Sequence, residues 1–177
     1  MIVSQALLQR ERGVAGTALP DVLEHSGAPR GSIYHHFPDG RAQLAEEATE
    51  WAAGFTSRRL ESLLASGDVV SALDAFVDDW TATLRDSEFA AGCPVVAGAL
   101  DKTTREAATA GFRQWERLLT DSLTASGLPI VRAESLAVMF IASIEGAIVL
   151  SRAEGTSRPL ERTADQLRSL LEKELAA

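Results

Sequence analysis

The stretch Thr17–Leu44, TALPDVLEHSGAPRGSIYHHFPDGRAQL, decides the fold, because it predicts two short helices that meet at a tight turn. Ser26-Gly27-Ala28 ends the first helix, and Gly27 suits the left-handed backbone position that closes many helices. Pro29 fits the first turn of the second helix, where a backbone N–H is not needed. Pro38 stops this second helix after about two turns.

The second of these helices has an apolar back and a polar front. Ile33 and Phe37 are four residues apart, so they share one helix face and are expected to pack inward. Ser32, Tyr34 and His35 point elsewhere. A short helix with a fixed apolar back and a hydrogen-bonding front suits the major groove of DNA. The pattern therefore predicts a DNA-binding helix-turn-helix.

The composition indicates a chain with a proper core. Its 177 residues are 46% hydrophobic, which fits one or two compact domains. No apolar run reaches membrane-spanning length and no signal segment precedes the first helix, so we expect a cytoplasmic protein without a membrane partner. The single cysteine excludes a disulfide framework within the chain and a multi-cysteine zinc site. We predict no metal and no cofactor.

The acidic residues are not evenly distributed along the chain. A net charge of −8 argues at face value against nucleic acid. From Met1 to Ala45, however, the basic and acidic residues balance: Arg10, Arg12, Arg30 and Arg41 against Glu11, Asp21, Glu24 and Asp39. A neutral DNA-contacting part joined to an acidic remainder predicts modest non-specific affinity for DNA.

The rest of the chain has helical periodicity and no predicted strand. The opening segment, from Ile2 to Arg12, places Ile2, Val3, Ala6 and Leu7 on one side. Thr17 is expected to cap the next helix. A long helix is predicted from Arg41 towards Leu64, with an apolar stripe made of Leu44, Ala48, Trp51 and Phe55. Further starts are predicted at the N-cap Asp68 and at Pro94.

The last two helices carry more apolar surface than one chain can cover. The segment from Arg132 to Arg152 is apolar nearly all round, and a final helix with one apolar stripe begins at Pro159. A helix that is apolar all round must be covered on both sides. We therefore predict an all-α fold of about nine helices and a two-fold homodimer through the last two.

Three segments resemble a known family. GVAGTALPDVLEHSGAPRGSIYHHFPDGRAQLAEEA resembles the DNA-binding domain of TetR-type transcriptional repressors. EFAAGCPVVAGALD and SIEGAIVLSRAEGTSRPLE resemble the LmrA/YxaF-like branch of that family. The resemblance implies a three-helix helix-turn-helix domain over residues 1–45 and a helical ligand-binding and dimerisation domain over 46–177. It also implies a homodimer on a near-palindromic operator in double-stranded DNA, and a small apolar or aromatic effector.

Carried over by position, the resemblance also implies the DNA contacts. The base or phosphate contacts fall on Arg30, Gly31, Ser32, Tyr34 and His35, the phosphate contacts on His36 and Arg41, and a backbone contact on Thr17. Family members usually carry a short basic arm before the first helix. This sequence either lacks that arm or depends less on phosphate contacts.

The candidates for a ligand cavity are apolar side chains at helical spacing, for which plain core packing is the simpler interpretation. They are Trp51, Phe55, Phe76, Trp80, Phe112, Trp115, Met139 and Phe140. Glu145 interrupts an apolar run, so it is a ligand contact, a polar point in the dimer interface or a solvated residue. Cys93 is a redox or electrophile sensor or, more simply, a small buried residue or helix cap.

The sequence contains no credible catalytic grouping. All three histidines, His25, His35 and His36, lie in the helix-turn-helix part, away from any expected pocket. Adjacent histidines on a helix point about 100° apart, which disfavours a metal site. We predict a regulator that is not an enzyme. The alternative is a helical ligand-binding or scaffold protein with little DNA affinity.

Overall fold

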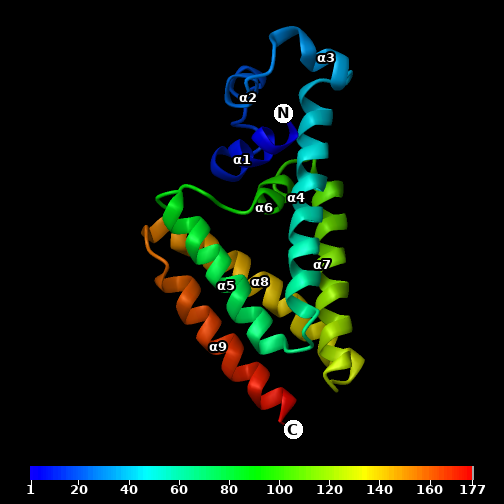
Figure 1. Ribbon diagram of the computed structural model, residues 1–177, viewed down its shortest axis with the longest axis vertical. Helices are drawn as coiled ribbons and strands as arrows, with labels where there is room; N and C mark the ends of the chain where they lie inside the picture. Colours follow the sequence, from blue (N-terminus) through cyan, green and yellow to red (C-terminus); the bar gives the residue numbers. More distant parts are fainter. Residues whose placement is uncertain (177) are drawn as a thin grey trace. The chain divides into compact units, whose positions relative to one another are not determined.

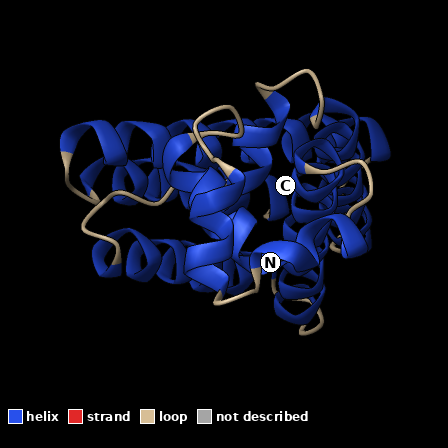
Figure 2. Cartoon of the chain, turned by 90° about the horizontal axis from the view of Figure 1, so that it is seen from above, coloured by secondary structure: helices blue, strands red, loops and turns tan. Residues whose placement is uncertain are grey.

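The computed structural model describes residues 1–176, apart from the side chain of Arg30. Over this range the chain consists of helices and loops, without strands (Figures 1 and 2). The elements are α1 (Ile2–Arg12), α2 (Leu19–Ser26), the 3₁₀ helix η1 (Arg30–Ser32), α3 (Ile33–His36), α4 (Arg41–Leu64), α5 (Val69–Asp86), α6 (Pro94–Ala99), α7 (Arg105–Ala125), α8 (Ile130–Glu154) and α9 (Arg158–Leu175). The predicted all-α class is confirmed.

These helices form two compact units. The first unit contains Met1–Phe55 and Gly92–Gly111, and the second contains Thr56–Ala91 and Phe112–Ala177. Helices α4 and α7 each contribute residues to both units. The spatial grouping is thus not a simple cut of the chain, because α6 and the start of α7 belong with the N-terminal helices. The functional division at residues 45 and 46 stays a prediction.

The core of the first unit joins the helix-turn-helix to the start of α4. Its buried members are Leu8 of α1, Val22 of α2, Ile33 of α3, Phe37 directly after α3, and Leu44 of α4. Ile33 and Phe37 are only 2% and 5% exposed, which confirms that they pack inward. Gly27 has a φ of 67°, so the predicted left-handed end of α2 is also confirmed.

The apolar side of α1 is only partly buried, and two polar side chains of this helix are buried instead. Val3 is 46% exposed, whereas Gln5 and Gln9 have no exposed surface. Hydrogen bonds account for much of this burial: Gln5 Nε2 donates to Gln9 Oε1 at 3.2 Å, and Gln9 Nε2 donates to Thr49 Oγ1 at 3.1 Å. Gln5 Oε1 is buried without a hydrogen-bond partner among the described residues. Gln9 Nε2 also donates to the Pro94 carbonyl at 3.1 Å. The hydrogen bonds offset the cost of burying a polar side chain. They join α1 to α4 and to the start of α6.

The second unit is a bundle built on α5, α7, α8 and α9. Asp68 caps α5 as predicted, because its carboxylate accepts from the backbone N–H groups of Val70 and Ser71, both at 3.1 Å. Arg168 of α9 reaches Asp74 of α5 at 2.6 Å. The Arg168–Asp74 pair and the apolar core hold α5 and α9 together, and α8 packs on both of them (Figure 1).

Helix α8 is apolar on two opposite sides. One stripe is buried in the unit: Ala133, Leu136, Ala137, Phe140, Ile144, Ala147, Ile148 and Ser151. The opposite stripe has exposed apolar side chains at Val131, Val138, Met139, Val149 and Leu150. By length and composition α8 could cross a membrane, with a mean hydropathy of 1.8. Its packing against α5 and α9 indicates instead the core helix of a bundle.

Candidate nucleic-acid interface and ligand pocket

The residues Arg30–His36, which form η1 and α3, are called the reading segment below. Ile33 and Phe37 anchor it from behind, and the Phe37 N–H donates to the Ile33 carbonyl at 2.7 Å. On the front, Gly31, Tyr34, His35 and His36 are exposed, and Tyr34 keeps 67% of its surface. A fixed back and an accessible polar front are what a groove-reading element requires.

Some polar groups of the reading segment already have hydrogen bonds or ring contacts within the protein. Ser32 is half-buried, and its hydroxyl donates to the Pro29 carbonyl at 2.7 Å, which leaves the oxygen able to accept. The rings of His35 and His36 meet edge-on with centroids 5.1 Å apart. The part of the chain that the structure describes contains no group of three or more possible metal ligands. The side chain of Arg30 lies outside the described residues.

Thr17 is placed differently from the sequence prediction. It has no exposed surface, and its hydroxyl donates to the Gly13 carbonyl at 2.8 Å. The predicted cap is wrong, because α2 begins after Ala18 without a side-chain cap. The hydroxyl is turned back into the α1–α2 loop, so this side chain has no surface with which to reach DNA.

Arg41 is exposed at the start of α4, but part of its guanidinium already has a partner. Its Nη2 donates to the Val14 carbonyl at 2.6 Å, which ties α4 to the α1–α2 loop. Its charge is also felt at Asp101, whose pKa is lowered mainly by the Thr103 N–H and to a smaller degree by Arg41. Arg41 therefore has a structural role, because it fixes the α1–α2 loop against α4. This role is independent of any contact with a DNA phosphate.

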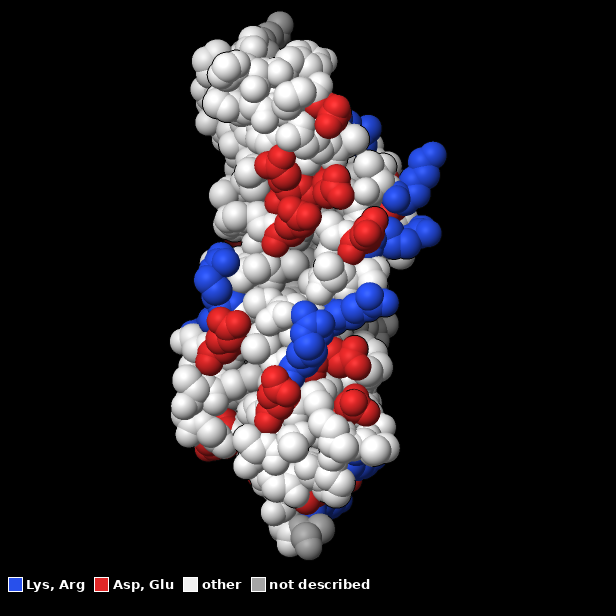
Figure 3. Space-filling view, turned by 90° about the vertical axis from the view of Figure 1, so that its right-hand side faces the viewer, with Lys and Arg blue, Asp and Glu red and all other residues white. Residues whose placement is uncertain are grey.

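Basic and acidic residues are equal in number from Met1 to Ala45. Arg12 of α1 pairs with Asp21 of α2 at 3.3 Å, so one of the few basic groups is partly neutralised. On the face drawn in Figure 3, acidic side chains gather in groups with basic ones beside them, and the described residues form no continuous basic stripe there. The predicted modest non-specific affinity for DNA is consistent with this distribution.

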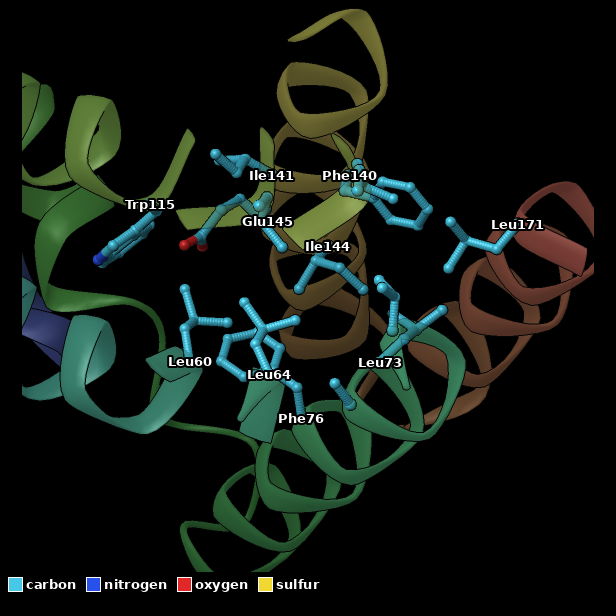
Figure 4. A pocket seen from close by; sticks show the side chains of 14 residues that line it. Leu60, Leu64, Leu73, Phe76, Trp115, Phe140, Ile141, Ile144, Glu145 and Leu171 are labelled. Atoms are coloured by element: carbon cyan, nitrogen blue, oxygen red, sulfur yellow. The ribbon is translucent and has the colours of Figure 1, made fainter. Parts of the chain in front are cut away.

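The second unit contains an apolar pocket with a volume of about 70 Å³ (Figure 4). It lies between the end of α4, α5, α7, α8 and α9. The lining residues are Leu60, Leu64, Val69, Ala72, Leu73, Phe76, Trp115, Leu119, Leu123, Phe140, Ile141, Ile144, Glu145 and Leu171. Ligand sites commonly measure ~300–1,000 Å³, so an effector of ordinary size must push the lining helices apart.

Of the eight predicted ligand residues, the pocket brings together Phe76, Trp115 and Phe140. Phe112 packs edge-on against Trp115 at 5.1 Å, behind the lining. Trp51 and Phe55 stack on each other along α4 at 5.7 Å, and Phe55 is 57% exposed. The other two also lie outside the lining: Trp80 packs on the bundle core and Met139 is 36% exposed on α8. Their predicted ligand roles remain untested.

The aliphatic residues of the pocket lining were not predicted from the sequence. Leu60, Leu64 and Leu73 line the pocket, yet nothing in the sequence separates them from ordinary core leucines. Glu145 carried a signal, because it interrupts an apolar run, and it is half-buried in the pocket wall. Cys93 is buried at the residue before α6, the setting that the simpler interpretation requires.

A helix-turn-helix joined by a continuous helix to a bundle with an apolar pocket defines a ligand-responsive class of DNA-binding regulator. The comparisons agree. Residues 7–48 match the model of the bacterial regulatory proteins of the TetR family, and residues 69–166 match the C-terminal domain of LmrA/YxaF-like transcriptional regulators. The chain belongs to the TetR family of transcription regulators, a non-enzymatic family, in its LmrA/YxaF-like branch.

Individual relatives cover nearly the whole chain. An HTH-type transcriptional regulator of Mycobacterium tuberculosis is 42% identical over 99% of this chain and 94% of its own. LmrA of Bacillus subtilis is 29% identical over 92% of this chain and 89% of its own. Among solved structures, a TetR regulatory protein from Rhodobacter sphaeroides superposes with a TM-score of 0.81 at 22% identity, covering 95% of each chain. That likeness supports the fold.

Proposed function

We propose that this regulator is a cytoplasmic, dimeric repressor that binds a near-palindromic operator and is released by a small apolar or aromatic effector. The observation that carries the proposal is the reading segment, whose apolar back is buried while Tyr34, His35 and His36 stay exposed. Gly31, with nothing within 4 Å of an added Cβ, leaves room for close approach to a base or the backbone. Arg30, Ser32 and Arg41 complete the proposed contact set.

Dimerisation is supported by the outer stripe of α8. Val131, Val138 and Val149 recur along one side of this helix and are all more than half exposed. Gly146 lies on the same side, and an added Cβ there would meet nothing within 4 Å, so a second helix can approach closely. Apolar surface of this extent on an isolated chain indicates an interface. The proposed partner is a second copy, related by a two-fold axis.

The release mechanism rests on the small size of the pocket. Leu60 and Leu64, from the end of α4, line it, and the first residues of α4 pack against the reading segment. An effector that widens the pocket must displace the end of α4. Two DNA-contacting units must sit about 34–36 Å apart to enter successive major grooves, so a small change in α4 lowers the fit. The effector must bind the released conformation better than the DNA-bound one.

The test is a mobility-shift titration on DNA upstream of the protein's own gene, at two salt concentrations. The expected result is a saturable, salt-weakened complex with a two-fold footprint. Tyr34→Ala should lower operator affinity about tenfold or more, since it removes the most exposed side chain of the reading segment. His25→Ala, on the exposed surface of α2, is the matched control and should bind as the wild type does.

Two results would contradict the proposal. Unchanged affinity of Tyr34→Ala, with dimer mass intact by sedimentation, would remove the reading segment from DNA contact. Failure of the wild type to bind at low salt would favour a ligand-binding or scaffold protein, for which the balanced charge near Arg12 and Asp21 is the supporting observation.

A further inference from the structure

Glu145 gives the pocket an unexpected chemical character. Every other lining residue that the structure describes is apolar, and Glu145 directly follows Ile144 on the same helix. Figure 4 shows its carboxylate directed towards the side of the pocket where Trp115 lies. A carboxylate in this wall makes the lining chemically different from a purely hydrocarbon surface.

A carboxylate restricts what can bind beside it. The ionised group only accepts hydrogen bonds, so the ligand atom facing it must be a donor. A positively charged donor forms the stronger, charge-assisted hydrogen bond, and the surrounding apolar wall reduces screening of that attraction by water. An anionic ligand meets repulsion in the same position. The chain's net charge of −8 adds a field of the same sign.

Aromatic rings in the same wall favour the same ligand. Phe76, Trp115 and Phe140 come from three different helices and all line the pocket. The face of an aromatic ring attracts a cation, most strongly for tryptophan. The rings also provide flat apolar contact for a ligand's aromatic body. The carboxylate and the aromatic faces are separate features, and both select a cation on an apolar body.

We infer that the pocket selects effectors that carry a positively charged nitrogen on a compact aromatic body, with Glu145 as the specificity-determining partner of that nitrogen. The inference rests on the proposed function in taking this pocket as the effector site. It goes further in naming the charge of the effector class and the residue that recognises it.

The experiment compares three probes that share one ring system and differ in charge. They are 2-(naphthalen-2-yl)ethylammonium, 2-(naphthalen-2-yl)ethanol and naphthalen-2-ylacetate, titrated into the full-length protein without DNA by calorimetry. We expect the ammonium probe to bind at least tenfold more tightly than the alcohol, and the carboxylate to bind more weakly than both. Tenfold corresponds to about 1.4 kcal/mol.

Variants then assign the selectivity to the residue. Glu145→Gln keeps the shape and removes the charge, so it should weaken the ammonium probe about tenfold and change the alcohol less than twofold. Glu134→Gln is the matched control, because Glu134 lies on the same helix but is exposed and outside the pocket. It should keep the wild-type ranking. Circular dichroism of each variant verifies that the fold is retained.

The outcomes separate this inference from the proposed function. Equal affinity for ammonium and alcohol in the wild type, or no binding of any probe, overturns the inference without any variant. An unchanged ranking in Glu145→Gln overturns the role of that residue. If the ranking holds but no operator complex forms or is released, the inference stands and the repressor proposal fails. If a neutral or anionic compound releases the operator while the ranking fails, the repressor proposal stands alone.

Discussion

Replacing Gln9 by Met tests the buried hydrogen bonds that join α1, α4 and α6. Methionine has a similar length and flexibility, so the change removes the amide and preserves most of the packing. Two buried groups lose the partner that Gln9 provides: the Pro94 carbonyl, bonded at 3.1 Å, and Gln5 Nε2, bonded at 3.2 Å. Thr49 keeps its bond to the Ala45 carbonyl at 2.8 Å.

The magnitude follows from the loss at Gln5. A buried donor without a partner costs ~1–3 kcal/mol, whereas the Pro94 carbonyl still accepts a backbone hydrogen bond inside the first turn of α6. We therefore expect Gln9→Met to lower the free energy of unfolding by about 2 kcal/mol. Gln5→Met in the same chain should restore about 1 kcal/mol, because it removes the stranded amide.

The assay is equilibrium urea unfolding followed by circular dichroism, at one fixed protein concentration because the stability of a dimer depends on concentration. Gln114→Met is the control, since the Gln114 hydrogen bond to Arg117 is exposed and water can replace it. A Gln9→Met variant that loses less than about 1 kcal/mol, with an unchanged denaturant slope, would refute the reasoning. Such a result would mean that the hydrogen bonds of Gln9 form because the helices pack together, and that they add little to the free energy of unfolding.

Three further predictions concern single positions. Arg41→Ala should weaken operator binding, and a salt slope reduced by about one would assign a phosphate contact, whereas an unchanged slope would assign only the tie to the α1–α2 loop. Gly98→Ala should lower the melting temperature, because the new Cβ would lie 2.7 Å from Thr49 Cγ2, and Thr49→Ser, which removes that methyl, should restore part of the loss. The pKa of Asp68 is lowered from 3.8, first by the Ser71 hydroxyl, so its stabilisation is present above that pH and is lost as the pH falls through the lower folded value. The stability difference between wild type and Asp68→Ala, measured by thermal melts across pH, should therefore shrink in acid.

Features that depend on neighbours in the sequence were predictable. Gly27 ends α2, Asp68 caps α5 and Pro94 opens α6, each through backbone geometry within a few residues. Ile33 and Phe37 were also predictable as inward-facing, because their spacing fixes one side of a short helix.

Features that depend on a distant carbonyl were not predictable. Gln9 has the composition of a surface residue, and only the carbonyl of Pro94, 85 residues away, makes its burial favourable. The burial of Thr17 has a different reason: its acceptor, the Gly13 carbonyl, is four residues away, but the sequence alone does not show the shape of the α1–α2 loop that brings the two groups together.

The pocket was predictable only in kind. Aromatic spacing placed Phe76, Trp115 and Phe140 among its candidates, but the same rule selected Phe55, which lies on an exposed side of α4. Periodicity locates an apolar stripe; it does not say which part of the stripe meets a neighbouring helix. The sequence shows that Glu145 interrupts an apolar run. Only the structure shows that it lies in the pocket wall, which is what indicates the chemistry of its ligand.

The interleaved first unit has a consequence for synthesis on the ribosome. The Gly92 N–H donates to the Arg10 carbonyl at 3.0 Å, and the unit closes only with Gly92–Gly111 in place. When α4 and α5 leave the exit tunnel, α6 has not yet been synthesised. Gln9 therefore still lacks its contact with the Pro94 carbonyl. The contacts between α1 and the α6 region therefore form late, although the apolar core from Leu8 to Leu44 is synthesised early. A nascent chain that stops before residue 92 should remain open to protease at α1, and only longer chains should acquire resistance there.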